Sequence, residues 1–256
     1  MLYGRSACAT AVVLAATFGA APTAGFDPAR EATQIRHPDA AELRLAALSD
    51  WPGPRAQEYL PEAARGETRR LGDEVRGGDG CRGPVDLAVL TPPYTGVTIE
   101  AQPTLFWFVG ADTGAPVEVE LYGAQVLDPI LKVSYAGGLP TGIHALALAD
   151  HEVDLERDVE YEWSVAVLCD PDDRAGDIVS VGTIRRIVPP PDLVRQLDGA
   201  SLERRAELLV EYGIWYDALE ALASLIERHP TSEQWREAWG GLLGQVGLHE
   251  AAAYDP

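Results

Sequence analysis

The densest group of possible metal ligands in the sequence is an acidic stretch between two predicted strands. Four carboxylates fall within eight residues there: Asp170, Asp172, Asp173 and Asp177. Calcium takes about six to eight oxygen ligands, so this stretch is a candidate calcium site. It lacks the complete spacing of an EF-hand loop, and Arg174 would compete with a cation for the carboxylates. We therefore favour a solvated turn and expect no metal or other cofactor.

Common catalytic signatures are missing from the sequence. The five histidines show neither H-x-x-x-H nor H-E-x-x-H spacing, and there is no G-x-S-x-G elbow or Gly-Lys-Ser/Thr phosphate loop. The paired carboxylates Glu118 and Glu120 share one face of a predicted strand, which is most simply the solvated face. Because catalytic triads assemble in space, an envelope hydrolase with a cryptic site stays the least favoured alternative. We expect a protein that is not an enzyme.

The cysteines and the N-terminus bear on the compartment. Residues 1–24 resemble a secretory signal peptide, with Arg5 ahead of an Ala/Val/Leu-rich core over residues 7–21; an uncleaved anchor helix is the alternative. No run of about 18 apolar residues follows, so we expect no spanning helix in the mature chain. Cys81 and Cys169 then remain, and in an exported protein they favour one disulfide over two unrelated thiols. We expect a periplasmic or extracellular location.

The charge balance excludes some partners. Lys plus Arg total 20 and Asp plus Glu total 40, for a net charge of −20. Such an acidic chain is an unlikely ligand of nucleic acid or of an anionic membrane surface, because both need a basic face. Residues 25–80 are rich in proline, glycine and mixed charge, and we predict a flexible leader there.

From residue 81 the apolar residues alternate with a period of two. This pattern predicts seven strands: residues 85–90, 104–109, 117–122, 131–135, 143–148, 161–168 and 179–187. Seven short strands without intervening helices are typical of an immunoglobulin- or fibronectin-like β-sandwich, which we place at residues 81–188. Trp107 is expected to fill the core between the sheets, and Tyr161 is placed as in a tyrosine corner.

The period changes to 3.6 after residues 189–191, three prolines that we interpret as an extended break. A small C-terminal helical subdomain is predicted at residues 192–256. An offset of 34 residues relates Ala206 to Gly240 and Leu209 to Leu243, an arrangement similar to tetratricopeptide helix pairs. A plain helical hairpin packed on the sandwich is the alternative.

Several aromatic residues of this helical region are candidate anchors for a partner. They are Trp215, Tyr216, Trp235 and Trp239. Tryptophan and tyrosine often dominate protein interfaces. Aromatic residues at helical spacing are more often core, however, so we favour a role in packing the helices on one another or on the sandwich.

A family resemblance accompanies these patterns. The matching segments include Cys-Arg-Gly at 81–83, Pro-Thr-Leu-Phe-Trp-Phe at 103–108, Tyr-Glu-Trp at 161–163, Tyr-Gly-Ile-Trp-Tyr-Asp-Ala-Leu at 212–219 and Trp-Gly-Gly-Leu-Leu at 239–243. Through these segments the chain resembles the bacterial domain-of-unknown-function family 928 over about residues 81–250. The resemblance implies an exported protein with this two-part layout, and it implies no catalytic residues.

Taken together, the sequence favours a non-enzymatic envelope protein that binds another envelope protein. A carbohydrate- or small-ligand-binding sandwich is the second hypothesis. Exposure of Trp107 or Trp163 on a flat face would support that second hypothesis, and burial of both would count against it.

Overall fold

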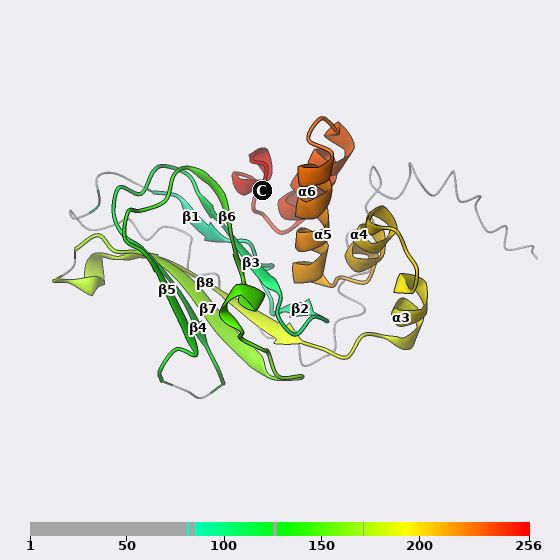
Figure 1. Ribbon diagram of the computed structural model, residues 1–256. Helices are drawn as coiled ribbons and strands as arrows, with labels where there is room; N and C mark the ends of the chain where they lie inside the picture. Colours follow the sequence, from blue (N-terminus) through cyan, green and yellow to red (C-terminus); the bar gives the residue numbers. More distant parts are fainter. Residues whose placement is uncertain (1–80, 82–84, 125–126, 171) are drawn as a thin grey trace, which may run out of the picture. The chain divides into compact units, whose positions relative to one another are not determined.

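The computed structural model describes residues 81, 85–124, 127–170 and 172–256. The predicted signal peptide (1–24) and leader (25–80) lie outside the described residues. Within the described residues the chain forms eight strands in two open sheets, followed by four α-helices (Figure 1). The predicted order, a β-rich region and then a helical region, is therefore confirmed.

The first sheet has three antiparallel strands in the order β1-β3-β6. These are β1 (Leu87–Val89), β3 (Thr104–Val109) and β6 (Gly142–Ala147). The second has the order β2-β8-β7-β4-β5, with β2 (Gly96–Thr98), β4 (Val117–Tyr122), β5 (Leu131–Tyr135), β7 (Glu160–Val167) and β8 (Ile178–Arg186). Among the eight described strands, β2 is the one that pairs in parallel, with β8. The seven predicted strands omitted β2, since three residues are too short to show a period and β2 exists through its pairing with β8.

Strand β3 is buried on both faces, which explains its unbroken apolar sequence. Trp107 faces the five-stranded sheet, with its ring centroid 6.1 Å from that of Tyr135 on β5. Phe106 and Phe108 face the helical region, where they contact Trp239 and Tyr254. Trp107 is fully buried, as expected from the sequence. At β3, the three-stranded sheet thus lies between the other sheet and the helices, while α5 also contacts the β2 edge of the five-stranded sheet.

Tyr161, the second residue of β7, is fixed by a hydrogen bond between its side chain and the backbone. The Tyr161 hydroxyl accepts a hydrogen bond from the Glu156 N–H at 2.9 Å. The preceding connection is closed by a second bond, from the Leu155 N–H to the Ala101 carbonyl at 2.8 Å. These bonds fix the entry into β7 and hold Leu155 in the core.

The helices are α3 (Pro191–Leu197), α4 (Leu202–Glu211), α5 (Trp215–Arg228) and α6 (Glu233–Gln245). The prediction that residues 189–191 form an extended break is wrong at its last residue, because Pro191 begins α3. Proline suits a first helical position, where its missing N–H is not needed. Gly213 has φ +68°, and this left-handed conformation lets the chain turn from α4 into α5.

Helix α5 is the central helix of the region. It contacts α4 and α6 as well as β2 and β3, so most of its surface is buried. One continuous cluster of buried side chains runs through the sheets and the helices. Among the described residues, none of the helices combines the length and apolar character that crossing a membrane requires.

Candidate functional site

The first turn of α5 binds the helices to both sheets, and we call this region the α5 junction. Its outermost contact is Trp215, whose indole Nε1 donates a hydrogen bond to the Leu90 carbonyl at 2.8 Å. Leu90 follows β1 directly and is fully buried. The bond therefore joins residues 125 positions apart in the sequence and satisfies a buried carbonyl that lies beyond the strand pairing.

The Tyr216 hydroxyl is the centre of a buried polar network. It accepts a hydrogen bond from Trp163 Nε1 at 3.0 Å and donates one to the Thr183 carbonyl at 2.9 Å. Thr91 Oγ1 lies 3.2 Å away. Burial raises the pKa of Tyr216 to about 12, so the hydroxyl keeps its proton at neutral pH. The network is a structural connection between α5, β7 and β8.

A glycine on β2 makes room for this tyrosine. A Cβ atom on Gly96 would lie 2.7 Å from Tyr216 Cε2, closer than real Cβ contacts. Since Gly96 pairs with Ile184 of β8, the ring of Tyr216 packs directly on the edge of the five-stranded sheet. The Tyr216 ring can therefore occupy this place only if residue 96 has no side chain.

Asp217, the next residue of α5, is the most unusual titratable group of the junction. Its side chain is 6% exposed, and Oδ1 accepts a 3.3 Å hydrogen bond from the Ile99 N–H. Oδ2 is buried without a hydrogen-bond partner. Burial raises the pKa of Asp217 to about 7, with a smaller contribution from the Glu100 carboxylate, while the Thr98 side chain and the Ile99 N–H act in the opposite direction. The acid is thus far less readily ionised than an ordinary aspartate.

Glu220 lies one turn further along α5. Burial raises its pKa, and Glu100 acts in the same direction. We refer to Glu100, Asp217 and Glu220 as the junction carboxylates. Among the described residues, no cation forms an ion pair with any of them.

The predicted anchors of a partner are all buried. Trp215, Tyr216, Trp235 and Trp239 are at most 7% exposed. Trp239 packs edge-on against Phe106 of β3, and its Nε1 donates to the Tyr254 carbonyl at 3.1 Å. In this structure the four residues fasten the helices to one another and to the sheets, so they do not form an exposed surface.

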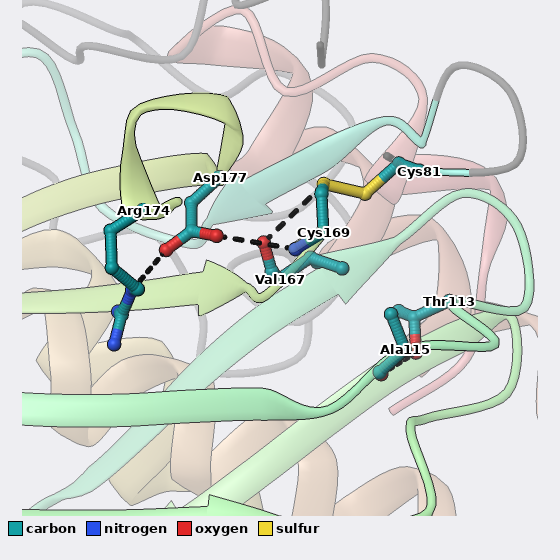
Figure 2. The surroundings of a disulfide bond; sticks show 7 residues. All are labelled: Cys81, Thr113, Ala115, Val167, Cys169, Arg174 and Asp177. Atoms are coloured by element: carbon teal, nitrogen blue, oxygen red, sulfur yellow. Dashed lines mark hydrogen bonds and ion pairs between the residues drawn. A yellow bond between two sulfur atoms is a disulfide. The ribbon is translucent and has the colours of Figure 1, made fainter. Parts of the chain in front are cut away.

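The carboxylates of the acidic loop are used locally. Asp177 is buried, accepts the Cys169 N–H at 3.2 Å and forms an ion pair with Arg174 (Figure 2). Asp173 accepts the Ala175 N–H at 3.0 Å, and Asp170 accepts the Asp172 N–H at 2.9 Å. No three potential metal ligands come together in the described part of the chain. The four aspartates therefore do not converge on one point as a calcium site requires.

A disulfide lies beside this loop. Cys81 and Cys169 are bonded, with their Cα atoms 4.6 Å apart (Figure 2). Cys169 follows β7, and its backbone N–H is the group that binds Asp177. The predicted pairing is thus present, and it ties the start of the described chain to the end of a central strand.

The outward face of β4 and β5 has carboxylates that are matched by cations. Lys132, the only lysine of the chain, lies 2.9 Å from Glu118 and 3.0 Å from Glu120, and Arg174 lies 3.1 Å from Glu118. Partial burial alone would raise the pKa of each glutamate. Lys132 and Arg174 nevertheless hold the pKa of Glu118 below the usual value, and the Tyr122 hydroxyl with Lys132 and Arg174 does the same for Glu120. We call Glu118, Glu120 and Asp177 the paired carboxylates.

Two further candidates from the sequence lie in the β-sheets. Trp107 and Trp163 are both fully buried, which counts against a flat aromatic sugar-binding face. The ring of His144 stacks on Trp107 with centroids 5.7 Å apart, and its Nε2 lies 2.8 Å from the Pro140 carbonyl. The partly buried His144 thus packs against the core through its ring.

The sequence interpretation missed the junction carboxylates. One signal was available: Asp217 falls on the apolar stripe of α5, between Tyr216 and Ala218, where an aspartate is unexpected. Glu100 gave no such signal, because its proximity depends on how the turn after β2 meets α5.

In a comparison with known protein families, one match spans most of the described residues. A family model with the description Domain of Unknown Function (DUF928) matches residues 65–255. The match covers the disulfide, both sheets and the α5 junction. No curated protein matches the chain.

Proposed function

The chain belongs to the DUF928 family, whose description names no activity, and we propose on the basis of its own residues that it is a non-enzymatic exported protein that binds another protein of the cell envelope. We propose further that the sheets are a variant of the immunoglobulin-like sandwich and that α4 to α6 are related to tetratricopeptide helices. The buried small residues Ala206 and Ala218 support this relation, since they allow α4 and α5 to approach closely.

The contacts of one family segment, residues 212–219, support a scaffold role. Within residues 212–219, the side chains of Trp215 and Tyr216 are committed to buried hydrogen bonds that hold α5 on the sheets. A catalytic motif would instead present reactive groups to a substrate. Side chains that hold α5 in a fixed position on the sheets, as Trp215 and Tyr216 do, are expected in a rigid binding module.

The exposed apolar side chains indicate where a partner would bind. Among the described residues, most of the large exposed apolar side chains fall in two short segments: Leu127 and Ile130 between β4 and β5, and Val188 and Val194 around the start of α3; Tyr254 near the last described residue is a further one. Exposed apolar groups that lie close together are typical of interaction sites. We assign the partner contact to the second segment, where the prolines also restrict the backbone.

Site-specific photocrosslinking in the native envelope tests this assignment. A photoreactive residue at position 188 or 194 of the full chain is expected to capture one specific envelope protein, identified by mass spectrometry. The same residue at Glu237, which is exposed on α6, is the matched control. Equal and unspecific capture at all three positions would contradict the proposal. The full chain is necessary, because removal of the helices would expose Phe106 and leave Trp163 Nε1 unpaired.

A ligand-binding sandwich is the second candidate, with its site on the loops at one end of the sheets. The burial of Trp107 and Trp163 weakens it but leaves the loops available. A thermal-shift screen with envelope glycans distinguishes the two functions: a dose-dependent rise in melting temperature without any protein crosslink favours this candidate.

A further inference from the structure

The junction carboxylates lie where α5 meets β2, and their charges are not balanced. Glu100 comes from the turn after β2, while Asp217 and Glu220 are three residues apart on α5. On β8, the charged residue in register with Thr98 of β2 is Arg186, whose Nη1 donates to the Leu155 carbonyl at 3.0 Å. From α4, the side chains buried against α5 include Ala206 and Leu209.

The geometry of Asp217 makes its ionised form costly. Oδ1 accepts one long hydrogen bond from the Ile99 N–H, and Oδ2 has no hydrogen-bond partner among the described residues. The Thr98 side chain also favours the ionised form, but burial outweighs it. A carboxylate that is removed from water without a counter-charge loses most of its hydration energy. The neutral acid avoids this cost, and it also avoids repulsion by Glu100. Burial and Glu100 are accordingly the two causes that raise its pKa to about 7.

We propose that Asp217 controls the attachment of the helices to the sheets by its protonation: the neutral acid lets α5 pack on β2, and the ionised form weakens that contact. The inference goes beyond the proposed function, because it concerns the α5 junction and requires no partner. It describes a two-state contact whose balance shifts with proton concentration.

The direction of the pH effect follows from the raised pKa. An aspartate in the unfolded chain has a pKa of about 3.9. Below that pH both states hold the proton, and the contribution of Asp217 to stability is fully present. Between about 3.9 and about 7 the unfolded state releases the proton while the folded state keeps it, so the folding equilibrium constant falls by up to about tenfold per pH unit. Above this range Asp217 causes no further loss.

The test is the pH dependence of unfolding in the full, oxidised chain. Denaturant unfolding followed by tryptophan fluorescence between pH 4.5 and 9 is compared for the wild type, Asp217→Asn and the exposed control Glu237→Gln. The wild type and the control are expected to lose stability between pH 5 and 7, whereas Asp217→Asn shows a much flatter profile there and unfolds at higher denaturant concentration at pH 8. An unchanged slope in Asp217→Asn overturns the proposal.

A second variant keeps Asp217 itself intact. Glu100→Gln removes the neighbouring negative charge, so the loss of stability should end at a lower pH than in the wild type. Amide hydrogen exchange in α5, corrected for the intrinsic effect of pH, should show faster opening above pH 7 in the wild type and less acceleration in Glu100→Gln. Identical pH profiles for both proteins would contradict the role of the junction carboxylates.

Discussion

The junction carboxylates and the paired carboxylates show how neighbours decide the behaviour of one chemical group. Glu118 and Glu120 lie on a sheet face that water reaches, next to Lys132 and Arg174, and their pKa values are lowered. Asp217 and Glu220 lie between a helix and a sheet edge without a cation, and their pKa values are raised. In a chain of net charge −20 cations are scarce, so only some carboxylates have one.

The two groups therefore make opposite demands on pH. Glu118 and Glu120 stabilise the fold above their unfolded pKa, and this contribution is lost as the pH falls through their lowered folded pKa. Asp217 and Glu220 have raised pKa values, so they stabilise the fold at low pH, and the contribution of Asp217 is lost as the pH rises toward 7. A mildly acidic optimum of stability follows from these two trends.

The largest expected effect tests whether the two regions are independent. Replacing both cysteines, as Cys81→Ala with Cys169→Ala, should lower the free energy of unfolding by about 2–5 kcal/mol, since the unfolded chain loses a long closed loop. Denaturant unfolding of the double variant against the oxidised wild type measures this loss. Because the bridge lies next to Asp177 and not next to α5, the slope between pH 5 and 7 should persist. A lost slope would show that the regions are coupled.

An effect of intermediate size on the free energy of unfolding is expected from a matched pair of tyrosine variants, one in each region. Tyr216→Phe leaves Trp163 Nε1 and the Thr183 carbonyl without their buried partner, so it should cost about 1–3 kcal/mol. Tyr122 donates to Glu120 at 2.6 Å on the sheet face that water reaches, and Tyr122→Phe should cost less than about 1 kcal/mol. Thermal and denaturant unfolding of both variants give the two values. Equal costs would mean that burial does not distinguish the two regions.

The smallest effect is expected on the paired side. Lys132→Met should change the free energy of unfolding by only about 0–1 kcal/mol, because ion pairs near water are weak and screened by salt. The pKa values of Glu118 and Glu120 should nevertheless rise toward their ordinary range, which an NMR titration detects. A large, salt-independent loss of stability would instead indicate that these pairs are effectively buried.

The comparison also separates what sequence patterns predict from what they miss. Continuous or alternating apolar residues predicted β3, β4, β5, β7 and β8 closely, and in β3, β4 and β7 an apolar face is buried along the whole strand. The pairing of Cys81 with Cys169 followed from their number. Strand β2 was missed, since its three residues gain their conformation from β8, and the start of α3 was missed because the prolines were interpreted as extended.

The candidate sites were harder to predict than the fold. For the aromatic residues of α5 and α6 the sequence left two roles open, partner anchors or core, and favoured core. Their burial against the sheets depends on the position of β3 between sheet and helices. The acidic loop had the ligands of a calcium site, but Arg174 and nearby backbone N–H groups use them. The meeting of Glu100 with Asp217 depends on residues 117 positions apart, and no local pattern reports such a contact.

The burial of β3 on both faces also has a consequence for biogenesis. A chain made from its N-terminus delivers β3 well before Trp239 of α6 and Tyr254, which contact Phe106 and Phe108. Until the last residues arrive, one apolar face of the three-stranded sheet has no cover, and exposed apolar strands promote aggregation. Burial of β3 therefore requires the helices and the residues after them. Chains truncated in the helices are expected to become substrates for chaperones and proteases.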